Sequence, residues 1–209
     1  NSFGATATVT NSTIMGNAAS SFSQGAGIRN NGTLPLANST VNGNTAAAWG
    51  GGIWNEGGTL TITGSTISNN TASDGAGIMS WPGSTLTLVD STISGNAATA
   101  TGGGIQLQGG FDLPNASHLV MTGTTISGNS AANGGGIHMG SGTIPATIAD
   151  STISGNTATA NGGGLNVAAG NLTLTNATVA SNTATTGGGI RHVPGATVSI
   201  RNSVVGDNT

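Results

Sequence analysis

The chain has 209 residues, 38 of them glycine, with a formal net charge of −3 and no cysteine. Only 4% of the residues are charged and 3% are aromatic, and lysine is absent. This composition excludes the basic surface that binds nucleic acid, disulfides and thiolate metal sites, and a segment apolar enough to span a membrane. Hydroxyl and amide groups must wet the surface in place of charges. We therefore expect an extracellular or cell-surface protein.

In chain order, the first expected element is an alternating strand over residues 5–10, and a short motif of the form Ser/Thr-Thr-Ile-x-Gly-Asn follows it. Variants of this motif occur eight times, with the aliphatic residue at Ile14, Val41, Ile67, Ile93, Ile126, Ile153, Val179 and Val205. Successive aliphatic positions are 27, 26, 26, 33, 27, 26 and 26 residues apart. A period in the twenties is typical of a solenoid, in which each coil buries its apolar face against its neighbours.

Two further signals recur within most periods. One is a glycine run that ends in an aliphatic residue, as in Gly50-Gly-Gly-Ile53, where glycine permits a turn at positive φ or close packing at a corner. The other is an alternating segment such as residues 58–63, which puts Leu60 and Ile62 on one face and threonine on the other. Such alternation indicates a strand with one buried side, and no segment shows the 3.6-residue period of a helix.

Together these signals predict an all-β fold with a single domain over residues 1–209. We expect a right-handed parallel β-helix, or β-solenoid, with three short strands per ~26-residue coil and about eight coils. Adjacent coils would lie ~4.8 Å apart, so that each aliphatic side chain sits above its equivalent in the next coil.

An asparagine follows each aliphatic residue of the motif by three positions. The set is Asn17, Asn44, Asn70, Asn96, Asn129, Asn156, Asn182 and Asn208. A buried amide must find hydrogen-bond partners. We therefore expect these side chains to form a structural ladder in which each asparagine bonds the next one and the turn backbone.

The interval between Ile93 and Ile126 is longer than the others, and its additional residues fall within 106–118. An insertion in a solenoid forms a loop, often on the binding face, although lengthening a surface loop is also well tolerated. Neither end of the sequence shows the polar cap that an isolated solenoid needs. We expect either a segment of a longer chain with flanking domains, or a fibre subunit stacked end to end on other copies.

The alternation of Gly-Gly-Gly-Ile with Ile-x-Gly-Asn resembles the GGAI and FxxN repeats of polymorphic outer-membrane proteins, although isoleucine or valine replaces phenylalanine here. Those proteins belong to the right-handed parallel β-helix repeat proteins of bacterial surfaces. The resemblance covers nearly the whole chain. It implies a right-handed coil and an extracellular passenger or stalk, often adhesive.

The acidic residues do not suggest a catalytic pair. They are Glu56, Asp74, Asp90, Asp112, Asp150 and Asp207. Asp90 and Asp150 precede their Ser-Thr-Ile motifs where other coils carry asparagine or glycine, which indicates turn residues. Glycoside hydrolysis needs two facing carboxylates, and the three histidines fall on different sheets or distant coils. We predict no catalytic residue, no cofactor and no metal site; a polysaccharide lyase or hydrolase is kept as an alternative.

One set of positions varies more than the rest. The residue after each glycine-run aliphatic, and the residue two positions later, are expected to point outward. They would gather Trp54, Glu56, Trp81, Gln106, Gln108 and His138 into one ligand or partner surface beside the insertion. Aromatic rings with amides suit surface glycans, and the alternative is that the tryptophans cover a corner or pack against a neighbour.

The predicted function is a non-enzymatic, extracellular structural or adhesive scaffold. The first alternative is a carbohydrate-binding or polysaccharide-processing β-helix that uses the tryptophan surface. A further alternative is ice binding through the outward threonines of the alternating strands, an array that Pro35, Pro145 and Val120 interrupt.

Overall fold

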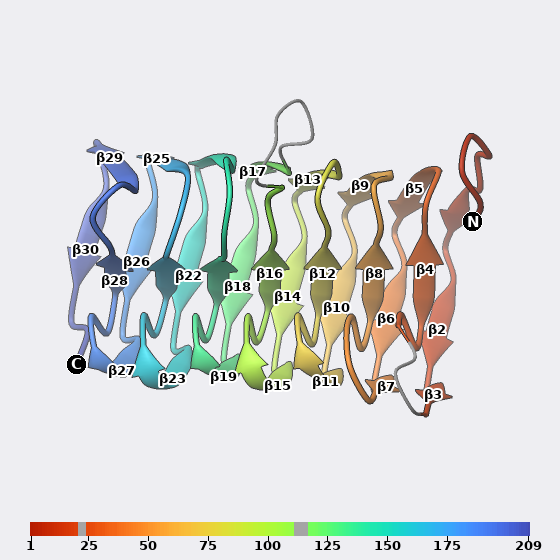
Figure 1. The fold of residues 1–209 in the computed structure, drawn as a ribbon, viewed down its shortest axis with the longest axis horizontal. Helices are drawn as coiled ribbons and strands as arrows, with labels where there is room; N and C mark the ends of the chain where they lie inside the picture. Colours follow the sequence, from red (N-terminus) through yellow and green to blue (C-terminus); the bar gives the residue numbers. More distant parts are fainter. Residues whose placement is uncertain (21–23, 111–116) are drawn as a thin grey trace.

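The computed structural model of the chain describes residues 1–20, 24–110 and 117–209. Within these residues the secondary structure consists of short strands without helix. The strands pair in parallel and stack into a rod, whose long axis lies horizontally in Figure 1. The predicted all-β parallel solenoid is confirmed.

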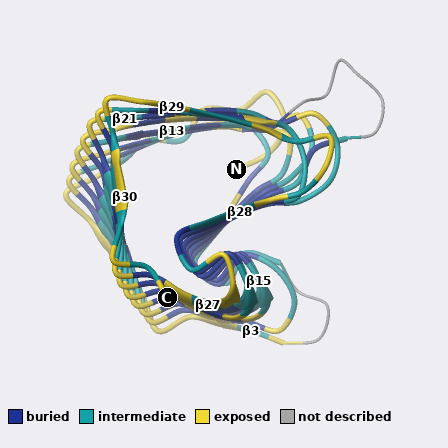
Figure 2. Ribbon diagram, turned by 90° about the vertical axis from the view of Figure 1, so that its left-hand side faces the viewer, coloured by how far each residue is buried: buried dark blue, intermediate teal, exposed yellow. Residues whose placement is uncertain are grey.

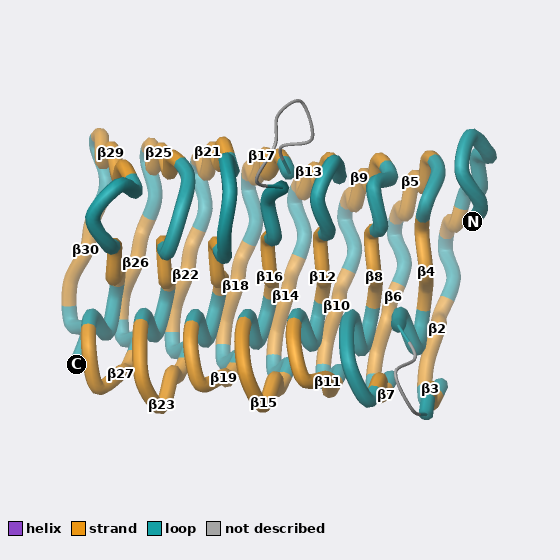
Figure 3. Tube along the Cα trace, viewed as in Figure 1, coloured by secondary structure: helices purple, strands orange, loops and turns teal. Residues whose placement is uncertain are grey.

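The strands form four sheets along the rod, which we name A to D (Figure 3). Sheet A contains β1 (Val9–Thr10), β5 (Thr33–Ala37), β9 (Thr59–Thr63), β13 (Thr85–Val89), β17 (His118–Thr122), β21 (Pro145–Ala149), β25 (Asn171–Thr175) and β29 (Thr197–Arg201). Sheet B contains β2 (Thr13–Met15), β6 (Thr40–Asn42), β10 (Thr66–Ser68), β14 (Thr92–Ser94), β18 (Thr125–Ser127), β22 (Thr152–Ser154), β26 (Thr178–Ala180) and β30 (Val204–Gly206).

Sheets C and D follow in each coil and have seven strands each. Sheet C contains β3 (Ala18–Ala19), β7 (Thr45–Ala46), β11 (Thr71–Asp74), β15 (Ala97–Thr101), β19 (Ser130–Asn133), β23 (Thr157–Asn161) and β27 (Thr183–Thr186). Sheet D contains β4 (Ile28–Asn30), β8 (Ile53–Asn55), β12 (Ile78–Ser80), β16 (Ile105–Leu107), β20 (Ile137–Met139), β24 (Leu165–Val167) and β28 (Ile190–His192). The rod thus has about seven complete turns, close to the eight periods of the sequence.

Each coil contains four strands, so the prediction of three per coil is wrong. The strand that the sequence did not indicate is that of sheet C, which follows the motif asparagine. Its inward residue is alanine, as at Ala72, Ala98 and Ala131, and these alanines form a small cluster apart from the main core. Alanine and threonine give little apolar contrast, and this explains why alternation did not reveal the strand.

The main core consists of aliphatic columns contributed by sheets A, B and D. In sheet B, Ile67 pairs in register with Val41 and Ile93, and all three side chains are fully buried. In sheet A, Leu60 pairs with Leu86 in the same way. Because each coil repeats the previous one by translation, burial of one or two aliphatic residues per strand, worth about 1.5–3 kcal/mol each, is repeated along the rod.

Two kinds of glycine shape the turn between sheets C and D. The first glycine of the run has a positive φ, for example 63° at Gly50 and at Gly102. The third glycine packs against the next coil: a Cβ on Gly104 would lie 2.6 Å from the carbonyl oxygen of Gly136 and 3.2 Å from Asn129 Nδ2. The run therefore combines a left-handed turn with a close approach of backbone to backbone, as its composition predicts.

The view along the rod shows how the glycine turn shapes the cross-section (Figure 2). After sheet C the chain turns back toward the middle of the coil, and sheet D then leads out again to sheet A. One face of sheet D borders the main core, and its other face is turned toward the side of sheet C. This second face carries Trp54, Gln106 and His138, half of the variable residues that the sequence singled out.

Candidate functional surface

The predicted asparagine ladder is present along the entire rod. Each Nδ2 donates to the Oδ1 of the asparagine in the next coil, for example over 3.0 Å from Asn70 to Asn96 and 2.9 Å from Asn96 to Asn129. The same Oδ1 also accepts the backbone N–H of the preceding asparagine, as Asn96 does from Asn70 over 3.0 Å. A further bond joins Asn96 Nδ2 to the carbonyl oxygen of Ile67. The ladder asparagines thus hold neighbouring coils together by hydrogen bonds.

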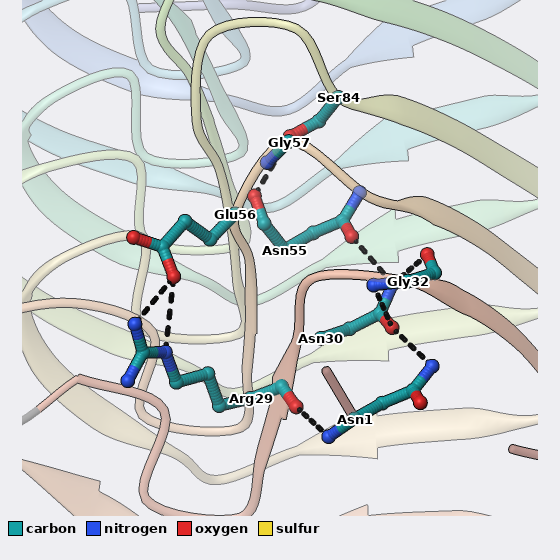
Figure 4. A network of polar contacts seen from close by, with 8 residues as sticks. All are labelled: Asn1, Arg29, Asn30, Gly32, Asn55, Glu56, Gly57 and Ser84. Carbon is teal, nitrogen blue, oxygen red and sulfur yellow. Dashed lines mark hydrogen bonds and ion pairs between the residues drawn. The ribbon is translucent and has the colours of Figure 1, made fainter. Parts of the chain in front are cut away.

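A second, shorter amide ladder lies near the N-terminus and was not predicted (Figure 4). Asn1 Nδ2 donates to Asn30 Oδ1 over 2.9 Å, and Asn30 Nδ2 donates to Asn55 Oδ1 over 2.8 Å. The next position in this column is Ser80, whose buried hydroxyl makes no hydrogen bond, and Leu107 follows it. The recurrence of Ile-x-Asn after two glycine runs was the available signal, and it is too short to stand out from the long repeat.

Asp90 and Asp150 lie at corners, as expected for turn residues. Asp90 and Asp150 have φ angles of 48° at the corner between sheets A and B, the same conformation as Asn38 and Asn176. The carboxylate of Asp150 accepts a hydrogen bond from Asn176 Nδ2 over 3.0 Å. In the described part of the chain, no three His, Asp or Glu side chains are grouped as a metal site would require. Asp112 lies outside the described residues.

The structure places the predicted ligand surface differently from the sequence. Trp54, Gln106 and His138 are buried, with 2%, 3% and 9% of their surface exposed. The prediction that they point outward to solvent is wrong. The first glycine of each run wraps closely around this face of sheet D: a Cβ on Gly50 would lie 2.8 Å from Trp54 Cβ, and one on Gly134 would lie 2.7 Å from His138 Cβ. Glu56, Trp81 and Gln108 remain half-buried.

All three tryptophans of the chain form one cluster, which includes Trp49, a residue that the sequence did not single out. The Trp49 ring lies 5.0 Å from that of Trp81 and 6.3 Å from that of Trp54, measured between centroids. The Arg29 guanidinium lies 4.6 Å from the Trp54 centroid, within cation–π range. It also contacts Glu56 Oε2 at 2.5 Å (Figure 4). Trp49 precedes its glycine run and reaches the cluster from the side of sheet C.

The family comparison agrees with this geometry: residues 1–183 match the family model described as the right handed beta helix region. The chain belongs to the right-handed β-helix family. Comparisons with curated proteins and with solved structures gave no match. The family assignment supports the expected hand of the coil. Among the described residues, no helix is long and apolar enough to span a membrane.

In this β-helix, the outer face of sheet D continues beyond the tryptophans as a row of polar side chains. Arg191 Nη1 donates to Asn166 Oδ1 over 3.1 Å, and Asn166 Nδ2 lies 2.9 Å from His138 Nδ1. Because a guanidinium can only donate, it fixes the orientation of the Asn166 amide, and that amide donates to His138 Nδ1. The neutral imidazole therefore carries its proton on Nε2.

His138 is held neutral by its surroundings. Burial lowers the pKa of His138 from 6.5 to about 4; Asp74 opposes this shift, and Arg191 adds to it. Desolvation thus outweighs the attraction of the carboxylate. This histidine is uncharged near neutral pH and acts as a hydrogen-bond acceptor within the row.

Three buried side-chain atoms of the described residues lack a hydrogen-bond partner: Trp54 Nε1, Ser80 Oγ and Gln106 Oε1. They belong to three consecutive strands of sheet D, β8, β12 and β16. An unpaired buried polar atom costs about 1–3 kcal/mol. All three atoms lie beside the tryptophan cluster. These coils therefore differ from the asparagine ladder, in which the buried amides are hydrogen-bonded. Residues 111–116 of the insertion that follows β16 lie outside the described residues.

Proposed function

We propose that this β-helix is a non-enzymatic structural and adhesive scaffold of the extracellular space or the cell surface. The continuous asparagine ladder carries the proposal, because it commits one buried amide per coil to holding neighbouring coils in register. Its likeness to the GGAI and FxxN repeats of polymorphic outer-membrane proteins supports a place on a bacterial surface. The low charge and the outward hydroxyls are consistent with a passenger or stalk.

The ladder also has a polarity that bears on partners. Within the described residues, Asn17 Oδ1 accepts no hydrogen bond at one end, while Asn208 N–H donates none at the other. A coil of the same pattern, from flanking parts of the same chain or from another copy, would extend the ladder at either end. Association of copies end to end would therefore be parallel and head to tail.

Sedimentation and electron microscopy of purified residues 1–209 test this proposal. We expect rods that lengthen with concentration, and a polar capping coil fused after Thr209 should block lengthening. Surface labelling of intact source cells tests the location. Turnover of a polysaccharide by the purified chain, or exclusively intracellular labelling, would contradict the proposal.

Ice binding is a second candidate, and sheet B favours it. The threonines of sheet A are interrupted, as expected, by Pro35, by Pro145 and by Val120, which is 46% exposed. Sheet B instead carries an outward threonine column that is unbroken from β2 to β26 and ends at Val204 of β30: Thr13, Thr40, Thr66, Thr92, Thr125, Thr152 and Thr178. Hydroxyls repeated every ~4.8 Å on a flat sheet suit an ordered water lattice. Thermal hysteresis abolished by Thr92→Tyr would support this candidate, and no hysteresis in the unaltered chain would dismiss it.

A further inference from the structure

Three neighbouring turns between sheets D and A place Trp81, Gln108 and Ser141 side by side. The backbone N–H of Gln108 donates to the carbonyl oxygen of Ser80 over 2.9 Å. Ser117 Oγ lies 2.8 Å from the carbonyl oxygen of Trp81 and 2.6 Å from that of Gln108. One coil further on, Gln108 Nε2 donates to Ser141 Oγ. An aromatic ring and an amide thus follow each other along the rod at the ~4.8 Å spacing of the coils.

The ring of Trp81 is held in place by the other two tryptophans. Its ring lies 34° from the plane of Trp49 at a centroid distance of 5.0 Å, and Trp49 rests in turn on the buried Trp54. Trp49 and Trp81 are both half-buried, so part of each residue is accessible to solvent. An aromatic surface that is fixed before binding loses little conformational entropy when a ligand packs on it.

The polar part of the same surface has unused hydrogen-bonding capacity. Gln106 is 3% exposed, its Oε1 has no partner, and its Nε2 makes two long contacts of 3.3 Å, to the Leu107 carbonyl oxygen and to Gln108 Oε1. The terminal torsion of a glutamine is broad. The amide is thus weakly held and able to turn toward a donor. Gly140 is needed for both amides to lie here, because a Cβ on it would come within 2.5 Å of Gln108 Oε1 and 3.0 Å of Gln106 Nε2.

The charged groups around this surface offer no unpaired cation to a ligand. Arg29 and Glu56 are paired with each other. Asp74 accepts hydrogen bonds from Ser73 over 3.0 Å and from Thr101 over 2.6 Å. An anionic ligand would find no free cation among these groups and would meet the Asp74 carboxylate, which favours a neutral ligand over an acidic one. The ligand must also offer an apolar face to tryptophan and hydroxyls to glutamine.

We propose that Trp49, Trp81, Gln106 and Gln108 form a subsite for a neutral, extended oligosaccharide that lies along the rod axis. One sugar ring packs on Trp81, and hydroxyls of the next ring bond the amides of Gln106 and Gln108. This inference goes beyond the scaffold function, which does not depend on it.

Tryptophan fluorescence is a direct test, since all three tryptophans lie in the cluster. The full chain is titrated with soluble hexasaccharides of glucose, N-acetylglucosamine, xylose and mannose, and with an oligogalacturonate as the acidic comparison. We expect at least one neutral probe to shift the emission. Trp81→Ala and Gln108→Ala should each weaken that binding about tenfold or more, while Trp81→Phe should retain most of it. Thr66→Ala, on sheet B, is the matched control and should bind as the unaltered chain does.

Circular dichroism and the melting temperature establish that each variant is folded; if Trp81→Ala does not fold, Gln108→Ala and Trp81→Phe decide. The proposal is overturned if no neutral probe changes the emission, if only the acidic probe binds, or if folded Gln108→Ala binds with unchanged affinity. Any of these results would leave the scaffold function standing. Filament formation and surface location test that function separately.

Discussion

Asn96 illustrates how much a single residue contributes to the joint between coils. Its Oδ1 accepts both the backbone N–H and the Nδ2 of Asn70, and its Nδ2 donates to Asn129 and to the carbonyl oxygen of Ile67. These bonds satisfy every polar atom of a side chain that has no exposed surface. Removing the amide leaves partners on both neighbouring coils unpaired.

We therefore expect Asn96→Ala to lower the free energy of unfolding by about 3–5 kcal/mol, because several buried partners lose their bonds at once. Thr92→Ala removes a hydroxyl from the outward side of the preceding strand and should change it by less than ~0.5 kcal/mol. Urea denaturation of both variants measures the difference. Equal stabilities would show that the ladder contributes nothing at this coil.

His138 makes the stability of the fold depend on pH. In the unfolded chain its pKa is near 6.5, and in the folded chain it is about 4. As the pH falls from 6.5 to 4, His138 becomes protonated in the unfolded chain and stays neutral in the folded chain. Protonation therefore stabilises the unfolded state, and the free energy of unfolding falls by up to about 3 kcal/mol. Above pH 6.5 this contribution is fully present.

Chemical denaturation between pH 4 and 8 measures this dependence. We expect His138→Asn to remove the loss of stability that protonation of His138 causes below pH 6.5. Asparagine does not titrate, and it already occupies the next position of the same column at Asn166. His118→Asn, at an exposed position of β17, should preserve it. A His138→Asn chain that still loses stability to the same extent over this range would refute the assignment.

At the scale of the element, the turn between sheets C and D depends on its third glycine. A Cβ on Gly104 would come within 2.6 Å of the Gly136 carbonyl oxygen, and the backbone offers no side chain that can move aside. Gly128, by contrast, has φ of 64° and nothing within 4 Å of its Cβ position. Substitution at Gly104 therefore tests the close approach of neighbouring coils, and substitution at Gly128 tests the left-handed backbone conformation.

Gly104→Ala should therefore destabilise the rod by more than about 3 kcal/mol, since neighbouring coils must separate locally. Gly128→Ala should cost about 1–2 kcal/mol, the strain of a left-handed alanine. Thermal unfolding followed by circular dichroism ranks the two. The reverse order would mean that close approach between coils is not what requires glycine at the third position of the run.

At the scale of the whole molecule, the coils behave as units of a one-dimensional stack. Each coil contacts mainly its two neighbours, through ladders that are continuous from β2 to β30 in sheet B and from β1 to β29 in sheet A. The stability of such an array is approximately a sum over coils and their interfaces. Length should therefore change by whole periods without loss of the fold.

Deletion of residues 153–178 joins Thr152 to Val179, which is the equivalent of Ile153 in the next coil. We expect this chain to fold, with a lower stability and a urea m-value reduced in proportion to the buried surface lost. Deletion of residues 153–165 removes about half a coil and should abolish cooperative unfolding, because apolar and polar columns lose their register. If the chain that lacks residues 153–165 still folds cooperatively, the 26-residue coil is not the structural unit of the rod.

The sequence alone determined the repeat, the parallel solenoid, the asparagine ladder and the turn role of Asp90 and Asp150. These features follow from translation: residues one period apart must stack, so their side chains reveal what each column does. Tertiary structure decided the shape of the cross-section. Sheet C was missed because alanine carries its buried face. The turn that it creates buries Trp54, Gln106 and His138 and brings Trp49 to Trp81. The angles at these corners are set by glycine and alanine, whose side chains are too small to signal in sequence which way the chain turns.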